Sequence, residues 1–141
     1  MENIILMNEV NKAIYNKLQA GTALSALIAG SANVYHLQPP DDTSMPYVIF
    51  NLQGGGNENV TPSPLRNLVY FVRGYSTASA AAAGSIRTEI NNLLDKQTLT
   101  LTDGWVNFWM QAESEIEGID NMPNGQKAYM AGDLYRIRLD K

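Results

Sequence analysis

The sequence predicts an α+β domain in which an antiparallel or mixed β-sheet of about five to six strands carries two main helices on one face. Two observations lead to this fold class. Helical and extended patterns follow one another in the order helix, strands, helix, strands, and 45% of the 141 residues are hydrophobic, which is enough to build a core. The length suits one domain over residues 1–141 and leaves little room for a second.

The chain opens with the pattern of an amphipathic helix. Apolar residues recur every three to four positions, and Gly21 ends the pattern. Thr22 is expected to cap a short second helix over residues 22–29, which Gly30 stops. The apolar face of the first helix consists of Ile4, Met7, Val10, Ile14 and Leu18.

The main helix is predicted over residues 76–96, with Ser76 or Thr77 as its N-cap. Its first half is nearly all alanine, so a sheet or a second helix can approach it closely. The predicted buried stripe consists of Ala82, Ile86, Ile90, Leu93 and Leu94.

Strands are predicted wherever apolar and polar residues alternate between turn signals. Asp103–Gly104 is expected to form a tight hairpin turn. Two segments rich in glycine and proline, residues 54–64 and 115–126, are expected to be loops, the first at the end of a wide hairpin. The predicted strands are residues 33–37, 46–53, 66–75, 98–102, 105–113 and 127–140.

These strands are apolar on both faces. Trp105 and Trp109 point to one side of a strand whose other side carries Val106, Phe108 and Met110. Two helices cover only one face of such a sheet, so the other face would be an apolar patch that another chain covers. Alternatively, the twisted sheet curls and buries both faces itself. The sequence leaves both alternatives open.

The composition excludes most enzyme chemistry. The chain has no cysteine, which rules out disulfides, thiolate nucleophiles and cysteine metal sites. Its one histidine, His36, cannot form a histidine-rich metal site within one chain, and a lone histidine in a strand is usually structural. Fourteen acidic against ten basic residues give a net charge of −4, which argues against a dedicated nucleic-acid binder. We therefore expect a binding or structural protein without a cofactor.

The surface and the N-terminus point to a soluble protein. Charged residues make up 17% of the chain, below the roughly 25% typical of soluble domains, so uncharged polar groups or apolar patches must cover much of the surface. The opening run MENIILMNEV has no basic region and is too short for a signal peptide. No stretch approaches the roughly 20 apolar residues of a membrane span. We expect a protein made inside a cell, without a membrane partner.

Two motifs resemble ligand sites. Gly54–Gly56 lacks the lysine and hydroxyl residue of a phosphate loop, and no helix begins there, so a flexible hairpin tip is expected. Glu113, Glu115 and Glu117 alternate, which places their carboxylates on one side of an extended chain, close to Asp120. Such a cluster can bind calcium or perform acid–base chemistry. The alternatives are a solvated strand end and an acidic lining that repels DNA inside a ring.

Several short segments, in order, resemble one protein family. The proline loop leads into the strand Met45–Phe50, and Gly74–Tyr75–Ser76 leads into the alanine-rich helix that ends at Leu93–Leu94–Asp95. The other matching segments are Ala13–Ile14–Tyr15 with Leu18, Val34–Leu37, and the alternating Tyr135, Arg136, Ile137 and Arg138. Together they resemble the small tail-completion, or tail-terminator, proteins of long-tailed bacteriophages and related prophages. Many family members have a short strand that ends in a basic or polar residue before the proline loop, and His36 holds that place here. The segment 114–127 is longer than in the family pattern, which leaves the pairing of the last two strands open.

The resemblance implies a structural protein of the virion that is assembled in the host cytoplasm. Family members form a six-membered ring on the end of the tail tube, stop tube growth and provide the surface that joins the tail to the head connector, and DNA passes through the ring. They are not enzymes and hold no cofactor. Two alternatives remain: a head-completion or adaptor protein of the phage neck, and a carboxylate-based metal-binding module.

Three groups of residues are candidates for contacts with partners. The loop residues are expected to touch the tail tube or the connector, the acidic residues to face the lumen or a ring contact, and the tryptophans to lie between subunits unless they are ordinary core residues. The loop residues are Gly54, Gly55, Gly56, Asn57, Glu58 and Asn59, the acidic residues are Glu115, Glu117 and Asp120, and the tryptophans are Trp105 and Trp109.

Overall fold

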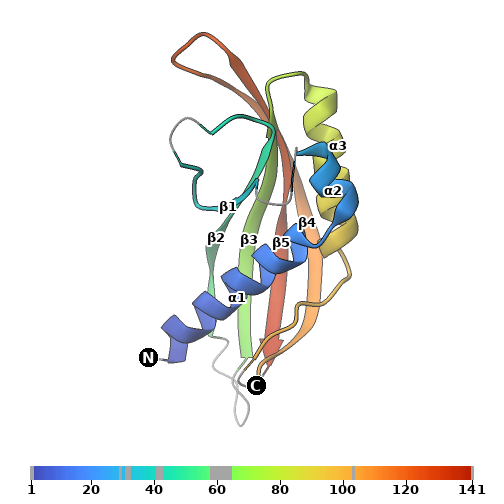
Figure 1. Cartoon of the computed structure of the whole chain (residues 1–141). Helices are drawn as coiled ribbons and strands as arrows, with labels where there is room; N and C mark the ends of the chain where they lie inside the picture. Colours follow the sequence, from blue (N-terminus) through green and yellow to red (C-terminus); the bar gives the residue numbers. More distant parts are fainter. Residues whose placement is uncertain are drawn as a thin grey trace.

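A computed structural model describes residues 2–28, 30, 33–40, 43–57, 65–102 and 104–140. These residues form three helices and a sheet with the strand order β1-β2-β3-β5-β4 (Figure 1). The helices are α1 (Glu2–Gln19), α2 (Thr22–Leu27) and α3 (Ala80–Leu94). The strands are β1 (Val34–His36), β2 (Tyr47–Asn57), β3 (Leu65–Ser76), β4 (Val106–Asn121) and β5 (Lys127–Asp140).

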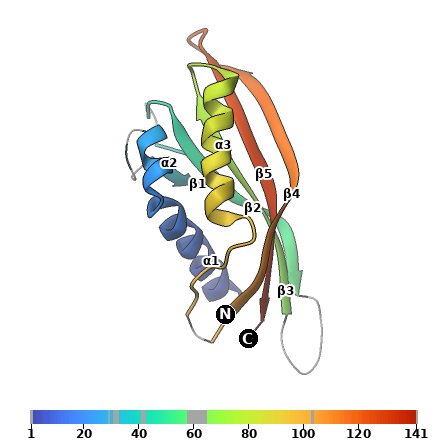
Figure 2. The same ribbon diagram turned by 90° about the vertical axis from the view of Figure 1, so that its right-hand side faces the viewer.

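The sheet is mixed. β1 runs parallel to β2, whereas the β2–β3, β3–β5 and β5–β4 pairs are antiparallel. All three helices lie on the same side of the sheet, as Figure 2 shows from the side. The predicted α+β class, with a mixed sheet and helices on one face, is confirmed.

The first two helices follow the predicted pattern, with one correction. Val10, Ile14 and Leu18 of α1 are buried as expected. The side chain of Ile4 lies outside the described residues. The predicted cap is wrong: Gly21 is the N-cap of α2, no side chain caps this helix, and Thr22 is its first residue.

The main helix begins later than predicted. Ser79 is its N-cap, and the Ser79 hydroxyl accepts a hydrogen bond from the Ala82 amide at 3.0 Å. Ser76 is instead the last residue of β3, where it pairs with Tyr129. The buried alanine is Ala83 rather than Ala82, and Leu93, predicted to be buried, is only half-buried. The strand ladder continues to Ser76, so the helix cannot start until the chain has left the sheet.

A glycine lets α3 approach the sheet. A Cβ atom on Gly74 of β3 would lie 2.3 Å from Cγ2 of Ile86, one of the buried residues of the helix. The Tyr135 hydroxyl of β5 donates a hydrogen bond to the Asn91 side chain at 3.0 Å, and burial raises the pKa of Tyr135, which keeps the hydroxyl protonated. The close approach that the alanine-rich helix predicted therefore depends on glycine in the sheet as well.

A buried ion pair joins α3 to the sheet. The Arg87 guanidinium donates two hydrogen bonds to the Asp133 carboxylate, at 2.6 and 3.0 Å, and Asp133 is only 1% exposed. Glu115 of β4 lies 3.1 Å from the same guanidinium. The hydrogen bond to Asp133 raises the pKa of Arg87. One arginine thus connects α3, β5 and β4.

A hydrogen bond joins the first helix, α1, to β3. The Tyr70 hydroxyl donates a hydrogen bond to the Asn11 side chain at 2.7 Å, and burial raises the pKa of Tyr70. The core around this contact contains side chains from both main helices and from all five strands. Its largest fully buried members include Tyr70, Tyr135, Phe50, Ile14 and Leu18.

The predicted strand over residues 98–102 is wrong. Residues 97–101 have no regular structure, so no strand pairs with β4 across the expected turn at Asp103–Gly104. Asp103 lies outside the described residues, and the Trp105 amide donates a hydrogen bond to the Thr102 carbonyl at 3.2 Å. Instead, single hydrogen bonds at Asp95 and Lys96, which follow α3, join this part of the chain to β4. The Lys96 amide donates to the Met110 carbonyl at 2.9 Å, and the Ala112 amide donates to the Asp95 carboxylate at 2.9 Å.

The predicted loop over residues 115–126 is also wrong. β4 continues to Asn121 and pairs with β5 along its whole length, up to the pair Asn121↔Lys127. Only residues 122–126 form the turn, in which Gly125 has φ +85° and the Met122 amide donates to the Gln126 carbonyl at 2.7 Å. The last two strands are therefore fully paired.

Two glycine-to-alanine substitutions are expected to change stability in opposite directions. G74A places a methyl group against Ile86 and should lower the free energy of unfolding by about 1–3 kcal/mol. Gly84 lies inside α3, where nothing is within 4 Å of an added Cβ. G84A should therefore raise the free energy of unfolding by about 0.5–1 kcal/mol, because alanine has the better helix propensity. Urea unfolding of both variants checks this, and a stabilising G74A would contradict the close approach of α3.

The Arg87 ion pair is expected to stabilise the fold mainly by neutralising Asp133. R87A leaves a buried carboxylate without its cation and should cost about 3–5 kcal/mol. E115A is the matched control: the Glu115 side chain is 79% exposed, and its loss should stay within about 0.5 kcal/mol. Equal losses in the two variants, measured by denaturant unfolding, would be inconsistent with this interpretation.

Candidate functional site

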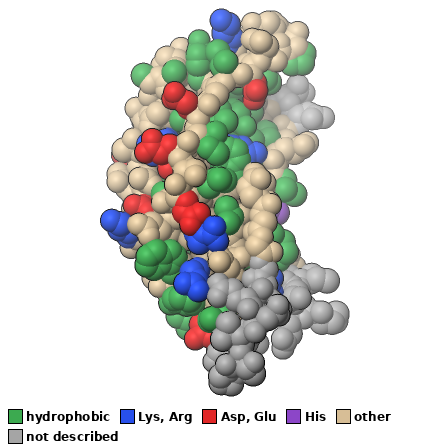
Figure 3. All heavy atoms as spheres, turned by 180° about the vertical axis from the view of Figure 1, so that it is seen from behind, with side chains coloured by type: hydrophobic (Ala, Val, Ile, Leu, Met, Phe, Trp, Pro, Cys, Tyr) green, Lys and Arg blue, Asp and Glu red, His purple; other side chains and the backbone are tan. Residues whose placement is uncertain are grey.

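The face of the sheet opposite the helices carries an aromatic patch. Among the described residues no helix lies on this face, and Figure 3 shows hydrophobic side chains spread along it between basic and acidic ones. Val106, Phe108 and Trp109 of β4 are its most exposed large hydrophobic residues, with Phe108 46% and Trp109 48% exposed. Such side chains gather at protein–protein contacts more often than at random.

A β-bulge turns both aromatic residues outward. The pairing of β4 with β5 shifts between Asn107 and Trp109, so Phe108 is the extra residue. Trp105, by contrast, is 9% exposed and belongs to the core. The predicted alternation, with Trp105 and Trp109 on one side and Phe108 on the other, is therefore wrong, because the bulge interrupts the period of two.

The bulge is held by a buried side chain, Asn107. Its amide group donates hydrogen bonds to the carbonyls of Trp109 and Arg138, at 2.8 and 3.1 Å. Its oxygen accepts a hydrogen bond from the Leu99 amide at 2.8 Å. One side chain thus fixes the bulge, the register with β5 and the segment that follows α3.

A groove runs beside the two aromatic residues. Residues 96–98, which follow α3, form one wall, and residues 108–111 of β4 form the other. It is lined by Lys96, Gln97, Thr98, Phe108, Trp109, Met110 and Gln111, of which only Lys96 is charged. The Arg138 guanidinium lies 5.4 Å from the centre of the Phe108 ring, within the range of a cation–π contact. The groove therefore combines an apolar floor with positive charge.

Arg73 organises the middle of the same face, a role that the sequence reasoning missed. Its guanidinium lies 4.5 Å from the Phe71 ring centre and donates hydrogen bonds to Asn51 at 2.5 Å and to the Tyr75 hydroxyl at 3.1 Å. The signal was present in the alternation of aromatic, basic and aromatic residues two positions apart. Arg136 pairs with Glu113 and also donates a hydrogen bond to the Asn67 side chain at 2.7 Å.

The acidic residues do not form one cluster. A second bulge, between Ala112 and Ser114, separates Glu113 from the others. Glu113 pairs with Arg136 on the helix-free face, whereas Glu115 pairs with Arg87 under α3. The expectation that alternation places the three glutamates on one side is wrong, and the described residues contain no group of three or more acidic or histidine side chains able to hold a metal ion.

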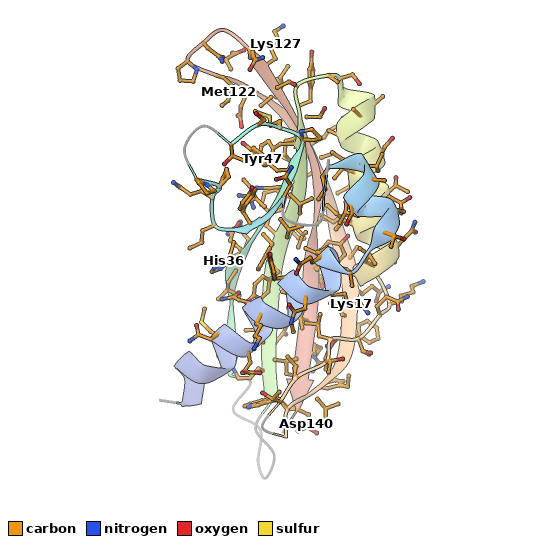
Figure 4. All side chains as sticks on the ribbon, viewed as in Figure 1. Lys17, His36, Tyr47, Met122, Lys127 and Asp140 are labelled. Carbon is orange, nitrogen blue, oxygen red and sulfur yellow. The ribbon has the colours of Figure 1, made fainter. Side chains whose placement is uncertain are left out.

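The distal part of the β4–β5 ribbon extends past the rest of the sheet. The last pair between β3 and β5 is Ser76↔Tyr129, so beyond it β4 and β5 form a two-stranded hairpin. Figures 1 and 4 show this hairpin, with Met122 and Lys127 at its end, at the opposite end of the molecule from Asp140. Asp120 in this hairpin is exposed, and so are Glu117 and Ile119 of β4 at its base, with Ile119 52% exposed.

The glycine run lies in a strand rather than in a loop. Gly54, Gly55, Gly56 and Asn57 belong to β2, while Glu58 and Asn59 lie outside the described residues. A Cβ atom on Gly55, which has φ +113°, would lie 2.1 Å from the Asn67 carbonyl oxygen. Glycine is therefore needed here by the backbone, independently of any flexibility.

His36, the last residue of β1, is exposed. Its ring lies 5.2 Å from the Phe50 ring, and partial burial lowers its pKa, so it is neutral near pH 7. No helix in the described part of the chain is long and apolar enough to cross a membrane.

Comparisons with known proteins identify relatives in fold and family. Twenty-four chains of solved structures match; one of them, described as "Virion of native gene transfer agent (GTA) particle", has a TM-score of 0.78 at 17% identity and covers 96% of this chain and 97% of its own. At this identity the likeness shows the fold alone. No curated protein matches.

The family assignment rests on a separate match. The family model described as "Tail completion protein gp17" matches residues 12–116, which is well over half of the chain. This range includes α2, α3, β1 to β3 and most of β4. The chain therefore belongs to the tail completion protein gp17 family, and it is a structural component of phage tails.

Proposed function

We propose that this protein forms a ring, of six copies as in the related terminators, at the head-proximal end of a phage tail tube. The ring ends tube polymerisation and presents the surface to which the head connector binds. DNA passes through its centre. The role requires neither catalysis nor a cofactor.

Family membership supports the place in the tail. A chain described as part of the virion of a gene transfer agent particle shares this fold. Both point to assembly with other structural proteins of such a particle.

The helix-free face supports self-association. Phe108 and Trp109 are each nearly half exposed in the folded chain, so apolar surface remains in contact with water. A partner that covered these side chains would bury this surface. Aromatic residues and arginine contribute most to binding energy at interfaces, and Arg138 lies against Phe108. This patch is the observation that carries the ring proposal.

The other candidate residues suit the remaining partners. The β2–β3 end, with Gly54 to Asn57 and the neighbouring Glu58 and Asn59, is the proposed contact with the tail tube or the connector. The exposed Glu117 and Asp120 are proposed to face the lumen or a ring contact, with Glu115 beside them. A net charge of −4 suits a channel that must let DNA pass without holding it.

Tube capping tests the proposal directly. When the protein is added to polymerising tail-tube protein from the same phage, we expect shorter tubes with density at one end only, because a bound ring blocks further addition. Electron microscopy of the tubes measures both. Six copies of 15.5 kDa give about 93 kDa, which native mass spectrometry of the released ring would report.

Portal-bearing heads provide the discriminating control. A neck adaptor would bind heads before tails are present and would leave tube length unchanged. Binding to heads without any effect on tubes would therefore replace the terminator role with the adaptor role.

A further inference from the structure

We propose that the distal β4–β5 hairpin of one copy docks into the groove beside Phe108 and Trp109 of the next copy. This inference deepens the ring proposal and rests on it. It assigns the contact between subunits to two named and different surfaces, and the partner of each is a second copy of this chain.

The groove offers a partner an apolar floor with positive charge. Phe108, Trp109 and Met110 contribute the floor, and Lys96 is the only charged side chain among its lining residues. Arg138 lies over the ring of Phe108. A matching partner would therefore insert an apolar side chain and place a carboxylate nearby.

The hairpin carries that combination. Ile119, which pairs with Tyr129 at the base of the hairpin, is 52% exposed. Glu117 lies two positions away and so on the same side of the strand. In the described part of the chain Glu117 forms no ion pair, whereas the neighbouring Glu115 is held by Arg87. Glu117 is thus available to a cation of another copy.

The two surfaces cannot meet within one copy. Ile119 and Trp109 lie ten residues apart on the same strand, which corresponds to about 30 Å. Figure 4 shows the hairpin end, marked by Met122 and Lys127, far from Asp140, which pairs with Val106 beside the patch. Each copy therefore carries one donor and one acceptor surface. A contact of this kind is heterologous, and it closes into a ring when the rotation between copies allows it.

A single such contact is small. A two-stranded tip buries much less than the roughly 800 Å² per partner of a standard stable interface. Each copy in a closed ring makes the contact twice, and attachment to the tube holds the copies at high effective concentration. The contact is therefore expected to form mainly on the tube or at high protein concentration.

Cysteine cross-linking tests which surfaces meet. The chain has no cysteine, so introduced thiols are the only ones. The full-length variants I119C and W109C are oxidised separately and as an equimolar mixture, at high protein concentration and after binding to tail tubes. We expect disulfide-linked dimers in the mixture and none in either variant alone. The double variant I119C/W109C should give a ladder of longer products, because every copy then carries both thiols.

A matched control uses another exposed hydrophobic residue. Leu27 of α2 is 40% exposed and lies outside the groove, so L27C mixed with I119C should give no disulfide-linked dimers. Equal cross-linking in that mixture, or dimers of I119C or W109C alone, would overturn the heterologous contact. Absence of dimers from tubes that are nevertheless capped would also overturn it while leaving the ring proposal intact. Failure of the unsubstituted protein to cap tubes, together with an absence of cross-links, would remove the two together.

Removal of the Trp109 side chain gives a quantitative test. W109A should raise the protein concentration needed to cap tubes by about tenfold or more, since a central aromatic side chain is lost from the contact. L27A should leave that concentration unchanged. Trp109 is half exposed, so a thermal melt close to that of the unsubstituted protein is expected and separates lost assembly from lost folding. Unchanged capping by W109A would contradict the proposed contact.

Discussion

The arrangement of the helix-free face depends on the buried side chain of Asn107. Its three hydrogen bonds reach Leu99, Trp109 and Arg138, which belong to the segment after α3, to β4 and to β5. A buried amide group without hydrogen-bond partners would lower the stability of the fold more than an apolar side chain in the same place. The bulge is the arrangement that gives the Asn107 amide group its partners. The outward position of Phe108 and Trp109 follows from this polar requirement, against the preference of their own rings for burial.

The same constraint shapes the edge of the sheet. An unpaired edge strand offers its backbone groups to any other strand, and proteins usually cover or interrupt it. Here the segment after α3 supplies single hydrogen bonds to Met110 and Ala112, and two bulges interrupt the regular spacing of β4. The edge of β4 is therefore a poor template for pairing with a strand of another chain. The surface that stays open beside it is the groove, which is lined by side chains.

Much of the fold could be predicted because its signals are local. The bounds of β5 and the β2–β3 hairpin follow from alternation and turn residues. Helical periodicity predicts the larger buried residues of α1 and α3, which are Val10, Ile14, Leu18, Ile86, Ile90 and Leu94. The failures involve distant partners. Residues 98–102 have strand propensity but meet the side chain of Asn107 instead of a ladder, and residues 115–121 contain loop residues but lie against the long β5. The sequence pointed to Trp109 and Glu117, yet their separation and exposure depend on bulges that have no clear local signature.

Folding and assembly use different residues in this molecule. The ion pair of Arg87 with Asp133 and the tyrosine hydrogen bonds to Asn11 and Asn91 join the helices to the sheet from inside. Phe108, Trp109 and Ile119 are absent from the buried core. A free copy can therefore keep its fold without a partner, and a contact between copies need supply only binding energy. Because that energy is small for a hairpin tip, a ring built in this way would form where the tube gathers the copies rather than in free solution.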